Sequence, residues 1–182
     1  MPLSESVERE QIHTRKIECH GYRRTDDLWD IDGHLTDSKT YPFENRHRGT
    51  IEPGEPVHDM WIRLTLTDDL EVVGCEAHSD AHPFANCSDI TPDYASIVGT
   101  RIRPGWNTRV RNRLGKEKGC THLTTLLRAL AVAAVQTILP LKKSELATGG
   151  ETSKKPLHLD SCHALRSDGP VAREFYPKWY RG

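Results

Sequence analysis

Apolar and polar residues alternate over two stretches of the chain, as they do in strands with one buried face. Over 28–37 (LWDIDGHLTD), Trp29, Ile31 and Leu35 fall on one side, and the residues between them are polar. The segment 60–67 (MWIRLTLT) repeats the alternation, and 71–77 (EVVGCEA) follows the turn DDLE as a return strand. The pattern predicts an antiparallel meander of about three strands.

Helical spacing takes over in the second half of the chain. Apolar residues recur at intervals of three and four along GCTHLTTLLRALAVAAVQTIL (119–139), which predicts a long helix ended by Pro140. Shorter helices are expected over 91–99 and over 104–115, the latter with Trp106, Val110 and Leu114 inward. Strands followed by helices indicate an α+β fold, with the C-terminal helices on one face of the sheet.

A chain of 182 residues is long enough for one substantial core. Residues 1–15 lack periodicity and are expected to be a mobile start. A single α+β domain is expected over 16–141, followed by a polar linker over 142–156. The tail, 157–182, is rich in aromatic residues and is expected to dock on the domain.

Composition narrows the classes of partner. The formal net charge is −1, which gives no overall reason to expect nucleic acid or a membrane as a partner. The first thirty residues contain no apolar signal segment, so a cytoplasmic location is expected. The five cysteines are odd in number and widely spaced, unlike a disulfide framework. The sequence is compatible with a homodimer but does not require one.

The start of the long helix carries a thiol and an imidazole, Cys120 and His122. The helix dipole favours a thiolate there, although a buried cysteine beside a hydrogen-bonded histidine would give the same residues. Cys87 lies in the turn after the meander, and His58 lies before its second strand. Because strand ends and helix starts converge in such folds, we expect His58, Cys87, Cys120 and His122 to bind one metal ion, zinc first and iron as the alternative.

Three further residues are candidates for substrate chemistry. Asp30 lies on the polar side of the first predicted strand, where it could act in proton transfer or simply face solvent. His163, in the segment DSCH, is a second proton-transfer candidate, with an ordinary loop as the alternative. Arg24, in GYRR, could bind a substrate carboxylate, or could pair with the neighbouring Asp26 and Asp27.

The segment 101–119 (RIRPGWNTRVRNRLGKEKG) contains seven basic residues and one acidic residue. Such a patch could attract a phosphate-bearing ligand such as a nucleotide or coenzyme A, or nucleic acid, although a solvated helix face explains it more simply. No RNA-binding signature, P-loop or GxGxxG accompanies it, so nucleic acid is not an expected partner.

Four segments, GYRRTDDLWDIDGHLTDSK, VHDMWIRLTL, GCTHLTTLL and DSCHAL, resemble a bacterial family known as domain of unknown function 2889. That resemblance implies no activity. Over about 55–140 the order of motifs is also similar to IscU/NifU-type scaffolds of iron–sulfur cluster assembly. This similarity implies that Cys87 and Cys120 match the second and third scaffold cysteines, that His58 falls near the scaffold aspartate, and that the first cysteine has no counterpart.

Three functions follow from these residues. The first is a zinc-dependent enzyme of hydrolase or lyase type acting on a small-molecule substrate, with one metal position open for water or substrate. The second is a carrier or scaffold for iron or an iron–sulfur cluster, which the missing first cysteine disfavours. The third is a binding module with structural zinc, which would need four closed protein ligands.

Overall fold

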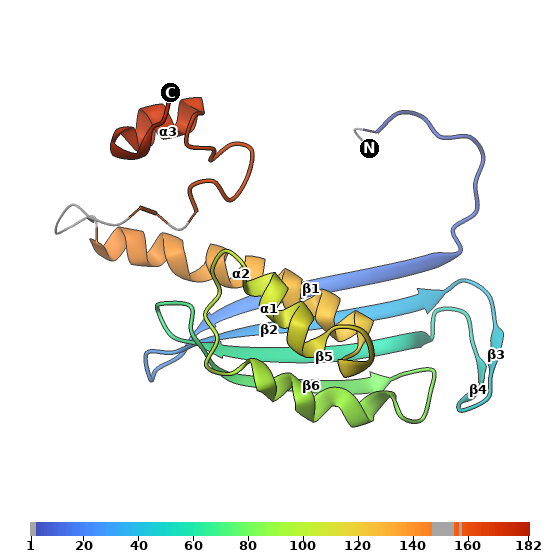
Figure 1. Cartoon of the computed structure of the whole chain (residues 1–182). Helices are drawn as coiled ribbons and strands as arrows, with labels where there is room; N and C mark the ends of the chain where they lie inside the picture. Colours follow the sequence, from blue (N-terminus) through green and yellow to red (C-terminus); the bar gives the residue numbers. More distant parts are fainter. Residues whose placement is uncertain (1–2, 147–154, 157) are drawn as a thin grey trace.

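The computed structural model describes residues 3–146, 155–156 and 158–182. Its centre is a four-stranded antiparallel sheet in the order β1-β2-β5-β6, with helices packed on one face (Figure 1). The strands are β1 (His13–Arg23), β2 (Trp29–Lys39), β5 (Pro56–Leu66) and β6 (Val72–Ala81). The class is therefore α+β as expected, but the predicted count of three strands is wrong, because β1 adds a fourth beside the meander β2-β5-β6.

The missed strand β1 is an edge strand with little apolar signal. Its sequence, HTRKIECHGYR, places only Ile17 and Cys19 as apolar side chains in register with the inward side of β2. An edge strand needs only one hydrogen-bonded neighbour, so pairing with β2 can form it without an alternating pattern. As a result, residues 13–15 of the expected mobile start belong to the sheet.

The long helix α2 (Thr121–Leu146) packs directly on β1 and β2. Gly33 allows this close approach, since a Cβ there would lie 2.8 Å from Leu130 Cδ2 and 2.9 Å from Leu126 Cδ1. The helix is long and apolar enough to span a membrane by length and composition. Its buried side chains nevertheless form the core with the sheet: Leu123, Leu126, Leu127, Leu130, Ala134 and Ile138.

Pro140 does not end α2, which continues to Leu146. A proline inside a helix leaves the carbonyl four residues earlier, that of Gln136, without its partner. Both residues are exposed, so water can hydrogen-bond to that carbonyl and the helix can continue. The expected linker over 142–156 therefore begins as helix, and its residues 147–154 lie outside the described residues.

Short elements complete the layer of helices. The 3₁₀ helix η1 (Cys87–Ile97) stands where a helix over 91–99 was expected, and α1 (Trp106–Leu114) confirms the helix expected over 104–115. Trp106, Val110 and Leu114 are all buried, as their spacing predicts. The remaining elements are β3 (Phe43–Asn45), β4 (Gly49–Ile51), η2 (Lys116–Lys118), α3 (Pro170–Phe175) and η3 (Pro177–Trp179).

Candidate metal centre

A row of polar side chains crosses the sheet on the face that the helices cover. Arg15 of β1 lies opposite Asp37 of β2, which in turn lies opposite His58 of β5. Asp37 is two residues beyond the buried Leu35, so it points to the same inner side of the sheet. Only 3% of Asp37 is exposed, and it is the one charged residue among the buried polar residues of the described structure.

The first turn of α2 brings His122 against this row. Its ring centroid lies 3.8 Å from that of His58. Asp37 Oδ2 lies 3.1 Å from His58 Nδ1 and 3.6 Å from His122 Nδ1. One ligand atom from each of the three residues lies within 4.8 Å of the other two. Two imidazoles and one carboxylate therefore converge from two strands and a helix.

Arg15 and His13 hold the carboxylate from the side of β1. Arg15 donates to both oxygens of Asp37, through Nε at 2.7 Å and Nη2 at 2.6 Å. The same Nη2 lies 2.6 Å from His122 Nδ1, so it can donate to that nitrogen when the nitrogen is unprotonated. His13 Nε2 lies 3.0 Å from Asp37 Oδ1. A positive guanidinium thus bridges two of the three ligand-type residues.

His58 Nδ1 is the one buried side-chain nitrogen or oxygen of the described residues that has no hydrogen-bond partner. It lies 3.1 Å from Asp37 Oδ2, but the two atoms do not meet hydrogen-bond geometry. A hydrogen bond needs alignment as well as distance, so the carboxylate oxygen does not satisfy this nitrogen. An unpaired buried nitrogen costs free energy unless some other partner takes its lone pair.

Burial and neighbouring charges set the protonation of the three residues. Burial lowers the pKa of His58 to about 4, with the charge of His122 adding to the effect and Asp37 opposing it. Burial, followed by the charge of Arg15, also lowers the pKa of His122. For Asp37, burial alone would raise the pKa, but the hydrogen bonds and charge of Arg15 outweigh it and the net pKa is lowered. At neutral pH the group consists of two neutral imidazoles and one carboxylate.

A buried tyrosine fixes the start of α2 and hence the place of His122. The Tyr94 hydroxyl, on η1, accepts a hydrogen bond from the Cys120 N–H at 3.0 Å. It also lies 2.9 Å from the Cys120 carbonyl oxygen and 3.0 Å from Thr124 Oγ1. These contacts tie the backbone just before α2 to the core, so a side-chain hydroxyl satisfies a helix-start donor that would otherwise need water.

The structure brings together two of the four expected metal ligands, His58 and His122. Cys87 and Cys120 do not belong to the group. Cys120 immediately precedes α2, and its side chain packs on the hydrophobic core. Cys87 begins η1, where its N–H donates to the Phe84 carbonyl. The third ligand-type residue at the site is Asp37, which was not among the four expected ligands.

The three expected substrate residues lie elsewhere. Asp30 points to the opposite face of the sheet, where it accepts a hydrogen bond from Thr65 Oγ1 at 2.8 Å. Arg24 pairs with Asp26 at 2.7 Å and with Asp30 at 3.3 Å, so one of the two neighbouring aspartates does serve as its partner. His163 is exposed in the C-terminal segment. The structure therefore does not gather these residues around the metal-ligand group.

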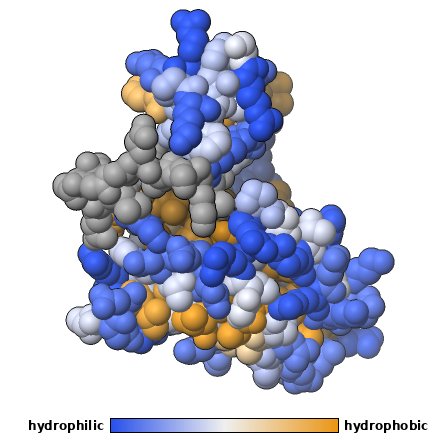
Figure 2. Space-filling model, turned by 60° about the vertical axis from the view of Figure 1, so that its left-hand side comes forward, coloured by the Kyte–Doolittle hydropathy of each residue, from blue (hydrophilic) through white to orange (hydrophobic). Residues whose placement is uncertain are grey.

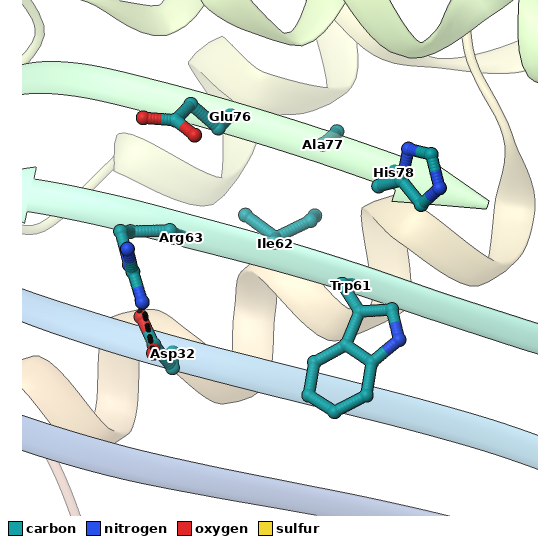
Figure 3. A pocket seen from close by; sticks show the side chains of 7 residues that line it. All are labelled: Asp32, Trp61, Ile62, Arg63, Glu76, Ala77 and His78. Atoms are coloured by element: carbon teal, nitrogen blue, oxygen red, sulfur yellow. Dashed lines mark hydrogen bonds and ion pairs between the residues drawn. The ribbon is translucent and has the colours of Figure 1, made fainter. Parts of the chain in front are cut away.

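The uncovered face of the sheet holds a second polar cluster, in a shallow depression of about 380 Å³ (Figure 3). There Arg63 donates two hydrogen bonds of 2.7 Å to Asp32, as the dashed lines show. Trp61 stacks on His34 with ring centroids 3.6 Å apart. Arg63 and Asp32 thus pair with each other. In the described part of the chain, the group formed by Asp37, His58 and His122 is the one cluster of three side chains of metal-ligand type.

Comparison with protein families assigns most of the chain to one family. The profile described as "Protein of unknown function (DUF2889)" matches residues 13–136, and the chain belongs to that family. The match covers the whole sheet and the first part of α2, including all three ligand-type residues. Neither the curated proteins nor the solved structures gave a significant match. The similarity to IscU/NifU-type scaffolds therefore gains no support.

Proposed function

We propose that this member of a family of unknown function is a metal-dependent enzyme of hydrolase or lyase type that acts on a small-molecule substrate. The metal, zinc in the first instance, would be held by Asp37, His58 and His122. The observation that carries the proposal is the convergence of three ligand atoms within 4.8 Å of one another. The unpaired, buried Nδ1 of His58 at the same place supports it.

The chemistry of the three side chains fits a divalent cation. Zinc sites use neutral imidazole nitrogens and ionised carboxylates, and the two histidines with Asp37 are in those protonation states at neutral pH. The donor set also resembles the two-histidine, one-carboxylate sets that bind ferrous iron, so iron is the alternative metal. A cation would supply a partner for the lone pair of His58 Nδ1.

Access from solvent favours a catalytic role over a structural one. Structural zinc sites use four protein ligands, whereas three leave a position for water or substrate. His122 and Arg15 each keep part of their side chain at the surface, with 27% and 34% exposed. The ligand group contains no cysteine, which disfavours the alternative of an iron–sulfur carrier.

Arg15 and His13 are the chain's own candidates for handling a substrate at this site. A bound metal there would polarise a substrate carbonyl or activate water. If His122 Nδ1 is a ligand, its lone pair can no longer accept from Arg15 Nη2, which frees a donor beside the site. The guanidinium is suited to a substrate carboxylate or phosphate. The His13 side chain contacts Asp37 Oδ1 and is about half exposed to solvent, so it is a candidate for proton transfer at the site.

The proposal is tested with purified protein freed of metal by chelation. Zn²⁺ and, under anaerobic conditions, Fe²⁺ are titrated by calorimetry into wild type, His58→Ala, His122→Ala and the control His78→Ala. Each protein is then assayed against a panel of nitrophenyl esters and lactones. We expect one metal per chain and metal-dependent turnover in wild type and His78→Ala, both lost in the other two variants. Absence of saturable metal binding in wild type would refute the proposal.

A further inference from the structure

A groove separate from the metal-ligand group lies on the outer side of α2. The helix α1 with its preceding loop forms one wall, and residues 158–165 of the C-terminal segment form the other, enclosing about 620 Å³. Figure 2 shows hydrophobic surface in the recess below the C-terminal segment. None of the three metal-ligand residues lines this groove, so it would act independently of the proposed metal chemistry.

The floor of the groove is apolar. It is formed by Ala131, Val132, Val135 and Leu139 of α2, together with Trp106 of α1. Val132 is 65% exposed, although it lies on the helix that carries much of the core. The groove falls within the range of volumes of small-molecule pockets in proteins, which are mostly apolar and carry a few polar groups.

The rim of the groove carries unbalanced positive charge. Arg103 and Arg128 line it, and neither has a salt bridge to a described residue. The carboxylate that lines the groove, Asp160, is already engaged by Lys155 and by the Ser167 N–H. Arg128 also borders a neighbouring groove lined by Arg111, Lys116 and Lys118, among others. An anionic group placed near Arg128 would therefore meet mainly positive charge.

We propose that this groove binds a small anionic amphiphile, whose apolar chain lies along α2 and whose carboxylate or phosphate head pairs with Arg128. The apolar floor accounts for the chain, and the unpaired guanidinium group of Arg128 accounts for the head. The occupant is thus selected by charge as well as by apolarity, so neutral and cationic amphiphiles of the same length should bind more weakly.

The test is calorimetric titration of decanoate, decyl phosphate and decyltrimethylammonium, each below its micelle concentration, into the full chain. We expect saturable binding of one anion per chain and binding of the cation at least about 10-fold weaker. Arg128→Gln should weaken anion binding by about 5-fold, the upper range for an exposed charge pair. Whichever of decanoate and decyl phosphate binds more tightly identifies the head group as carboxylate or phosphate.

Val132→Glu serves as the blocking variant, because its exposed position leaves folding intact while putting a negative charge on the floor. We expect it to weaken anion binding by at least about 10-fold, and Val73→Glu, at an exposed position on β6, to have no effect. Equal binding by wild type and Val132→Glu, or equal binding of the anion and the cation, would overturn the proposal. So would a dimer in sedimentation that Val132→Glu dissociates, since a second copy would then occupy the groove.

Discussion

Acid should destabilise the metal-free protein mainly through His58. In the unfolded chain this histidine takes up a proton near its ordinary pKa of 6.5, whereas in the folded protein burial delays uptake until about pH 4. Between these values the unfolded state binds more protons, so the free energy of unfolding falls as pH falls from about 6.5 to about 4. Well above pH 6.5 both states are neutral at His58 and the effect vanishes.

The magnitude follows from the difference between the two pKa values. One pKa unit corresponds to about 1.4 kcal/mol, so a difference of about 2.5 units gives roughly 3 kcal/mol across the whole window. The side chain of His58 is only 15% exposed, so solvent screening takes little from this figure. Roughly 3 kcal/mol is a large part of the stability of an ordinary domain.

Urea denaturation in the presence of a chelator, at pH 7.0 and pH 4.5, measures this effect. Wild type should lose about 2 kcal/mol more than His58→Gln, which cannot take up the proton. His78→Gln provides the control, since the His78 ring is 72% exposed on the other face of the sheet. If His58→Gln lost as much stability as wild type, the buried neutral histidine would be the wrong cause of acid sensitivity.

Three further predictions concern the start of α2, the partner of Asp37, and the packing of α2 on β1. Tyr94→Phe should lower the free energy of unfolding by about 1–2 kcal/mol and weaken zinc binding, because the start of α2 loses its hydroxyl partner; unchanged urea midpoints and affinity would contradict this. Arg15→Gln should destabilise the metal-free protein by about 1–2 kcal/mol, because the buried Asp37 carboxylate loses its guanidinium partner. It should nevertheless tighten zinc binding by calorimetry, because a competing positive charge is removed, and weaker zinc binding would count against the ligand set. Gly21→Ala should lower the melting temperature, because the new Cβ would lie 2.1 Å from Thr137 Oγ1. Adding Thr137→Ala should restore part of the loss, and purely additive effects in the double variant would rule out that clash.

Alternation identified the interior of the sheet correctly. Trp29, Ile31 and Leu35 are buried as the pattern of β2 predicts, and β5 follows the same rule. The edge strand β1 escaped detection because it satisfies its backbone by pairing with β2 and contributes few apolar side chains to the core. The prediction that α2 ends at Pro140 was wrong, because water can replace one helix hydrogen bond at an exposed position.

The sequence predicted only part of the candidate site. The structure brings His122, at the start of a helix, and His58, on a strand, together as expected, and their role as metal ligands stays a prediction. The sequence did contain a sign of Asp37's role. Asp37 is two residues after Leu35, so the alternation of β2 places this acidic side chain on the buried face of the sheet. The role of Arg15 depends on the register between β1 and β2, which no local pattern reveals.

The most direct test of the metal centre is zinc K-edge X-ray absorption on the zinc-loaded protein, with His122→Ala for comparison. Zinc lies about 2.0–2.1 Å from imidazole nitrogen, about 2.0–2.2 Å from carboxylate oxygen and about 2.3 Å from cysteine sulfur, so the ligand types can be distinguished. The account predicts a first shell of nitrogen and oxygen alone, including two imidazoles, that is lost in His122→Ala. A sulfur shell would instead show a cysteine ligand and contradict the Asp37–His58–His122 centre.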